Sequence, residues 1–124
     1  MNRAELEERL LLLVDQQVIT THASDVTKLA FERLIDSLNV RELEQAEMLF
    51  THLPTALSRI GNGESVEGPA PEIMSEIKTS PHFHLAEKQV IFIEGQWGKE
   101  LPLEEKEYLY MHYTNVINLT VEGE

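Results

Sequence analysis

Apolar residues return every three or four positions through long stretches of this chain, and this spacing restricts the fold more than any other feature of the sequence. A stripe with a period near 3.6 residues is typical of a helix that buries one face. Residues 3–17 show it, and so do a segment that ends near Leu38, a segment from Glu42 to Ile60 and the segment that starts at Pro102. The sequence therefore predicts an all-α fold.

Residues that start and stop helices separate these segments. THASD, residues 21–25, offers Ser24 or Asp25 as a side-chain cap for the second helix. GNGESVEGPAP, residues 61–71, is predicted to be a loop because it holds three glycines and two prolines. Pro71 can then open a short helix, which Pro81 ends.

QVIFI, residues 89–93, is the one stretch that reads equally well as a strand. The apolar positions around it keep the helical period over a length that is too great for one strand, and no partner strand is visible. These positions are Phe83, Ala86, Val90, Ile93 and Trp97. We therefore expect a compact bundle of five or six helices, without a sheet, as a single domain over residues 1–124.

Composition excludes several classes of function. The chain has no cysteine, so disulfides, thiolate metal sites and thiol nucleophiles are ruled out. No apolar run approaches the roughly 18 residues that cross a bilayer, and the charged start is unlike a signal peptide, so a cytoplasmic protein is expected. A net charge of −12 argues against direct binding to nucleic acid. One arginine or a helix N-terminus could still hold a phosphate at contact distance.

His52 and Arg59, in THLPTALSRI, are the first candidate site residues. Seven positions make about two helical turns, so both side chains would point in nearly the same direction and both could reach a small anion. Pro54 lies between them and requires either a kink or a helix that restarts with Thr51 as its cap. A restart would place free amides beside His52. On spacing alone, a partly exposed polar residue beside a helix stripe is the simpler interpretation.

The other histidines have simple structural explanations. His112 falls on the apolar stripe of the last helix, with Tyr108, Leu109, Val116 and Leu119, where a buried neutral imidazole is usual. His82 and His84 suggest a metal site, but residues two apart do not face together on a helix and no carboxylate motif follows. His22 is interpreted as a polar residue before a helix cap.

Known catalytic motifs are missing from the sequence, including the phosphate loop, the dinucleotide fingerprint, the nucleophile elbow and the zinc-protease pair. Glu104 and Glu105 are explained by the positive end of the last helix dipole. We therefore predict that the protein is not an enzyme and uses no cofactor or metal.

The order of features from His52 onward resembles the phosphotransferase-system regulation domain, the PRD. That family has a His followed by Leu or Ile with an Arg seven residues on, and then an aromatic-and-alanine signature before a helix pair. It ends with Leu-Pro, two acids and a second His seven residues after the latter acid. The matching positions are His52, Leu53, Arg59, Phe83, Ala86, Leu101, Pro102, Glu104, Glu105 and His112. The N-terminal helices match only by pattern.

The resemblance implies a helical bundle, commonly a homodimer, that regulates transcription or carbohydrate metabolism. Its histidines accept phosphate from the phosphocarrier protein or a permease B subunit of the bacterial sugar phosphotransferase system. His52 and His112 would be the phosphoacceptors and Arg59 the phosphate-contacting neighbour. Family members control an attached antiterminator or transcription activator. Here one domain fills the 124 residues, so an unknown downstream partner protein is expected instead.

Two positions depart from the family pattern. Thr51 stands where an acid often precedes the first His, and Glu107 stands where a small residue is usual. The charge of Glu107 would oppose a phosphate on His112. The leading hypothesis is a stand-alone regulatory domain that responds to histidine phosphorylation. The alternative is a helical adaptor that has lost the phosphoacceptor function, which these departures favour and the two retained histidines disfavour.

Overall fold

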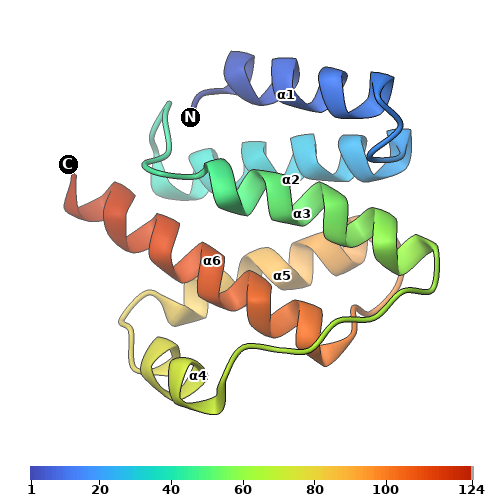
Figure 1. The fold of residues 1–124 in the computed structure, drawn as a ribbon. Helices are drawn as coiled ribbons and strands as arrows, with labels where there is room; N and C mark the ends of the chain where they lie inside the picture. The colour runs from blue at the N-terminus through green and yellow to red at the C-terminus, as the bar shows by residue number, and fades with distance from the viewer. Residues whose placement is uncertain (124) are drawn as a thin grey trace.

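The computed structural model describes residues 1–123, and they form six α-helices without a β-strand (Figure 1). The all-α prediction is confirmed, and QVIFI is part of a helix as predicted. The helices are α1 (Arg3–Asp15), α2 (Thr21–Leu38), α3 (Glu47–Gly61), α4 (Pro71–Lys78), α5 (Phe83–Trp97) and α6 (Leu103–Glu122).

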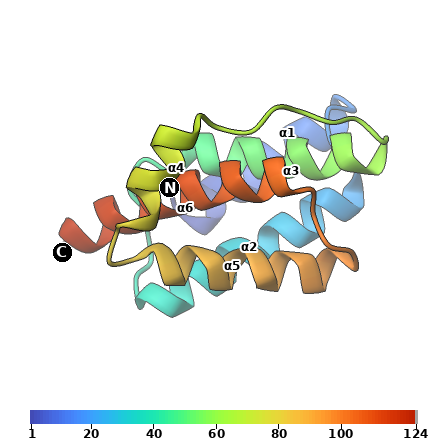
Figure 2. The same cartoon turned by 90° about the horizontal axis from the view of Figure 1, so that it is seen from below.

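Four of the helices enclose the core. Helix α2 packs against α3 and α5, and α6 packs against the same two helices, so the four close into a ring. Neighbours in this ring run antiparallel (Figure 1). Helix α1 covers α2 from outside, and α4 packs against α6. The connection 62–70 leads from the end of α3 to α4 at the opposite end of the bundle, as Figure 2 shows. Within residues 1–123, none of the helices has the length and apolar character to cross a membrane.

Aromatic side chains join three of the core helices. Phe31 of α2, Phe50 of α3 and Tyr113 of α6 have no exposed surface. The Phe50 ring lies edge-on to Phe31, with 5.1 Å between centroids, and edge-on to Tyr113, with 6.4 Å. Edge-to-face contacts of this kind add to the stabilisation from buried area. Phe50 therefore connects α3 to both of its neighbours in the ring.

Replacing Tyr113 by phenylalanine should stabilise the protein by about 1 kcal/mol or more. The Tyr113 hydroxyl is buried and finds no hydrogen-bond partner among residues 1–123, and burial raises the pKa of this phenol. The substitution removes the unsatisfied group and keeps the packed ring. Urea unfolding measures the change in stability. The control is Tyr110→Phe, because Tyr110 is on the same helix and its ring is partly exposed. A clear loss of stability in Tyr113→Phe alone would mean that the hydroxyl has a partner, such as a buried water.

The start of α2 differs from the prediction. Thr20 is the N-cap, and its Oγ1 accepts a hydrogen bond of 3.1 Å from the amide of Ala23. Ser24 and Asp25, the predicted caps, lie inside the helix. The prediction was wrong because Thr20 is an equally suitable cap about one turn earlier, and the earlier start lets Ala23 and Ser24 reach the core.

Helix α3 begins five residues later than its predicted start near Glu42. Leu43 and Ala46 are buried, but they reach the core from irregular backbone. The amino group of Met1 donates to the carbonyl of Leu43, and the amide of Glu44 donates to Thr120 Oγ1 over 3.0 Å. These tertiary bonds replace helical ones. Gln45 adopts a positive φ of 48°, which interrupts any helix here.

Pro54 lies inside α3, which is continuous from Glu47 to Gly61. The alternative in which the helix restarts at Thr51 is therefore wrong, and His52 is not beside a helix N-terminus.

The buried face of helix α6 also differs from the prediction. Tyr113 and Ile117 face the core, whereas Leu119 is 38% exposed.

Candidate functional site

His52 and His112 meet where α3 packs against α6. Their ring centroids are 5.1 Å apart, although the residues are sixty positions apart in the sequence. The Tyr108 ring, about one helical turn before His112, lies 5.5 Å from the His52 ring. The antiparallel packing of the two helices thus brings together the two histidines that the sequence resemblance singled out.

Arg59 and His52 face one carboxylate, that of Glu105 in the first turn of α6. Arg59 Nη2 donates to Glu105 Oε2 over 3.3 Å, and His52 Nε2 lies 3.6 Å from Glu105 Oε1. The Glu105 side chain is only 3% exposed. Arg59 and His52 therefore both reach one anion, as their spacing predicted, but this anion is the carboxylate of Glu105 and not a bound ligand.

From the sequence, Glu105 was explained by the helix dipole and matched as an acid of the family motif, but its contact with His52 and Arg59 was not predicted. A signal for it existed in the sequence. Glu105 precedes His112 by seven positions, as His52 precedes Arg59, so each pair lies on one face of its helix. When two such faces meet, all four side chains converge.

His52 Nε2 and Glu105 Oε1 are both buried without a hydrogen-bond partner in residues 1–123. Their separation of 3.6 Å is too long for a hydrogen bond. A small rotation of either side chain would bring them into hydrogen-bond distance and satisfy both atoms. Nε2 would then carry the proton, and Nδ1 of His52 would keep its lone pair.

Both histidines are held in the neutral form. Burial, followed by the nearby His112 and Arg59, lowers the pKa of His52 from 6.5 to about 4. Burial also lowers the pKa of His112. Near pH 7 each ring therefore has a nitrogen lone pair, which an attack on an electrophile requires.

The lowered pKa of His52 predicts a specific loss of stability in acid. The unfolded chain binds a proton at this residue below about pH 6.5, whereas the folded protein binds it only near pH 4. The free energy of unfolding should therefore fall as the pH drops through this window, and the contribution should be constant above it. Urea unfolding of the wild type and His52→Gln at about pH 7.5 and 5 measures the effect. The variant should lose less stability than the wild type, and equal losses would contradict the shifted pKa.

The two histidines open onto a groove of about 390 Å³ between α1, α3 and α6. It is lined by Arg9, Glu47, Met48, Thr51, His52 and His112. His112 also borders a neighbouring groove of about 420 Å³ that runs along the C-terminal half of α6. An approaching molecule can therefore reach the paired rings from the surface.

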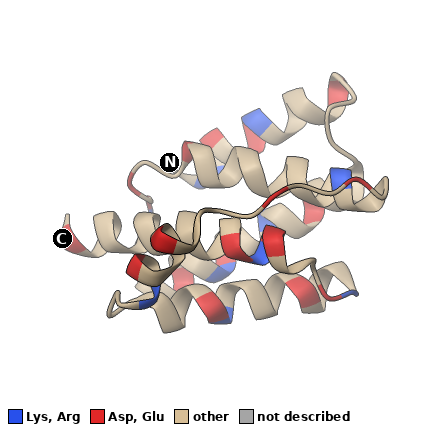
Figure 3. Ribbon diagram, turned by 60° about the horizontal axis from the view of Figure 1, so that its bottom comes forward, with Lys and Arg blue, Asp and Glu red and all other residues tan. Residues whose placement is uncertain are grey.

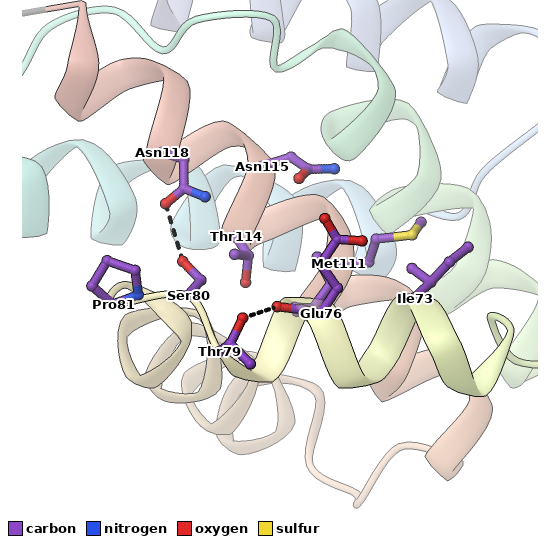
Figure 4. Close-up of a pocket in the computed structure, with 10 residues that line it drawn as sticks. Ile73, Glu76, Thr79, Ser80, Pro81, Met111, Thr114, Asn115 and Asn118 are labelled. Carbon is purple, nitrogen blue, oxygen red and sulfur yellow. Dashed lines mark hydrogen bonds between the residues drawn. The ribbon is translucent and has the colours of Figure 1, made fainter.

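A larger hollow of about 510 Å³ lies between α4 and α6 (Figure 4). Some of its polar side chains form hydrogen bonds to other groups of the protein. Ser80 Oγ donates to Asn118 Oδ1 over 3.3 Å, and Thr79 Oγ1 donates to the carbonyl of Glu76 over 2.7 Å. Neither His52 nor His112 lines it. We therefore place the candidate site at the smaller groove, where the reactive groups converge.

Glu107 does not lie beside His112. Five positions along a helix separate two side chains by about 140°, so Glu107 and His112 lie on different faces of α6. Glu107 Oε1 lies against Gly68 of the connection 62–70, 3.2 Å from where a Cβ on that glycine would be. The lowered pKa of His112 comes from burial alone. The structure therefore gives Glu107 no direct effect on His112.

The remaining histidines lie away from this groove. His22 is in the first turn of α2 and not before its cap, and its ring stacks on Trp97 with 4.6 Å between centroids. His82 is the N-cap residue of α5, and His84 is exposed. No cluster of three or more potential metal ligands occurs within residues 1–123.

Residues 24–116, most of the chain, match the family model of the PRD domain. The matched segment includes α3, α5 and the part of α6 that carries His112, but it leaves out α1. Comparisons with curated proteins and with solved structures gave no match. With both histidines, Arg59 and Glu105 inside the matched segment, the chain belongs to the PRD domain family, a family of regulatory domains.

Proposed function

We propose that this protein is a regulatory domain of the bacterial sugar phosphotransferase system, in which His52 accepts a phosphoryl group from the phosphocarrier protein or a permease B subunit. The observation that carries the proposal is the pairing of His52 and His112 over 5.1 Å at a groove open to the surface. Family membership supplies the class of donor.

The site is suited to accept a phosphoryl group on Nδ1 of His52. Nε2 has almost no accessible surface and faces a carboxylate, which would repel an incoming phosphate. In the transfer, the lone pair of Nδ1 attacks phosphorus, the phosphorus–nitrogen bond of the donor phosphohistidine breaks, and that electron pair stays on the donor imidazole. The Nε2 proton stays on His52, and Glu105 compensates the positive charge of the substituted ring.

Phosphorylation changes the local charge sharply. A phosphoryl group adds about 1.5 to 2 negative charges. It arrives at a site that already holds the buried carboxylate of Glu105, in a chain of net charge −12. We propose that this change alters contacts with a protein partner, and that two copies of the chain associate, as in the family.

A protein partner fits the charge distribution better than a nucleic acid does. Acidic residues occur on α4, α5, α6 and the connection 62–70, as Figure 3 shows. Basic residues number 10 against 22 acidic ones. Binding to a phosphate backbone requires clustered Lys and Arg. We therefore propose that the signal passes to a regulator protein.

Incubation with phosphoenolpyruvate, the general phosphotransferase enzyme and the phosphocarrier protein tests the proposal. The protein should gain an acid-labile, alkali-stable phosphoryl group. Omission of the phosphocarrier protein is the control and should abolish the label when that protein is the donor. A purified permease B subunit is the second donor. If neither donor labelled the protein, the phosphoacceptor proposal would fail, and the alternative of a helical adaptor protein would remain.

A further inference from the structure

The groove at His52 contains a cation that the family resemblance does not mention. Arg9 of α1 lines the groove, and so does one carboxylate, that of Glu47. Arg59 does not line it. The charge of Arg59 is already paired with Glu105. Among the residues that line the groove, Arg9 therefore carries the permanent positive charge, because the two histidines are neutral near pH 7.

Arg9 is held beside His52 by two hydrogen bonds to α3. Its Nη1 donates to Thr51 Oγ1 over 2.7 Å and to the carbonyl of Glu47 over 3.4 Å. Within residues 1–123, no carboxylate oxygen lies within 4 Å of the Arg9 guanidinium, whereas Arg3 on the same helix pairs with Glu32. The Arg9 guanidinium thus makes no close ion pair among these residues, and N–H groups remain for another acceptor.

We propose that Arg9 and Thr51 form a phosphate subsite that binds the phosphoryl group carried by His52. The proposal rests on the phosphoacceptor function proposed above. A guanidinium offers a planar set of donors that matches phosphate oxygens. Thr51 Oγ1 accepts from Arg9, so its own hydrogen is free to be donated to a phosphate oxygen. Arg9 also offsets Glu47, the carboxylate that lines the groove.

The proposed subsite gives a role to Thr51 and to Arg9, for which the sequence alone offers none. Thr51 stands where relatives often have an acid, and in this chain the threonine is the residue that Arg9 contacts. Arg9 lies outside residues 24–116, the segment that matches the family model. One of the two residues of the subsite therefore lies outside the segment that matches the family model, and the packing of α1 against α3 brings it to Thr51.

A small chemical donor tests the subsite without a partner protein. With phosphoramidate, the His52 nitrogen attacks phosphorus, the bond to nitrogen breaks and ammonia leaves, so any effect of Arg9 on protein docking is avoided. The rate of phosphohistidine formation and its lifetime after the donor is removed are followed by phosphorus NMR. Arg9→Gln keeps a hydrogen-bonding side chain and loses the charge. Arg3→Gln, on the same helix, is the matched control.

Arg9→Gln should slow phosphorylation by about tenfold, and added salt should slow the wild type but not this variant. The phosphorylation rates of the control Arg3→Gln and of Arg9→Lys should stay closer to the wild-type rate. Should Arg9→Gln disturb folding, Thr51→Val provides a second test, with an expected loss of phosphohistidine lifetime. Equal rates, lifetimes and salt dependence in Arg9→Gln and Arg3→Gln would overturn the subsite alone. A wild type that takes no phosphate from phosphoramidate or from the protein donors would overturn the proposed function and the subsite together.

Discussion

His52→Ala is expected to lose nearly all of the acid-labile phosphoryl label, whereas His112→Ala should keep much of it. His52 is the ring next to Glu105, with Arg59 paired to the same carboxylate, and its lowered pKa of about 4 keeps it a neutral nucleophile. Within residues 1–123, His112 forms no ion pair or side-chain hydrogen bond of this kind, and it contributes mainly by its position 5.1 Å away. Labelling with the protein donors, followed by separation in alkaline conditions, measures both variants.

The control for this comparison is His84→Ala, because His84 is exposed and is not among the residues that line the groove. It should be labelled like the wild type. Unfolding curves for the three variants separate a lost acceptor from a lost fold. Label in His52→Ala that equals the wild type would move the acceptor to another residue and remove the basis for the role of Glu105.

Phe50→Ala should destabilise the protein by about 3 to 5 kcal/mol, the usual cost of deleting a buried aromatic side chain. Phe50 has no exposed surface and contacts both Phe31 and Tyr113. The cavity would lie between α3 and α6, the helices that position His52 and His112. A loss of this size is a large part of the stability of a small domain. Urea unfolding at neutral pH gives the value.

Met48→Ala is the matched control, because this residue is on the same helix and is 73% exposed. Its effect should stay within about 0.5 kcal/mol. If Phe50→Ala changed stability as little as Met48→Ala, the edge-to-face cluster would not hold α3 against α6. Other contacts between α3 and α6 would then have to hold His52 and His112 together.

Helical periodicity predicted the elements well but their boundaries less well. The period through Phe83, Val90 and Trp97 identified α5 correctly, because a stripe of that length has no other regular explanation. The start of α3 was missed because Leu43 and Ala46 are buried without being helical. The bonds that hold this segment come from Met1 and Thr120, which are distant in the sequence. Such tertiary contacts leave no local signal.

The sequence singled out some of the residues that meet at the candidate site, but not their contacts with nearby charged groups. The motif pointed to His52, His112 and Arg59, and the structure brings them to one place. Glu105 was assigned to the helix dipole because a first-turn acid needs no further explanation in sequence. Arg9 had no motif at all, since only the packing of α1 against the other helices places it beside Thr51.

Phosphorus–nitrogen correlation NMR of the phosphorylated wild type tests the central claim most directly. The protein is labelled with nitrogen-15 in histidine, phosphorylated by the phosphocarrier protein and measured in alkaline buffer, and His52→Ala identifies the signal. The structure predicts a phosphoryl group bonded to Nδ1 of His52, because Nε2 is closed off against Glu105. The account would be contradicted if the phosphoryl group were bonded to Nε2 of His52 or to a residue outside the groove. The absence of any phosphohistidine signal would also contradict it.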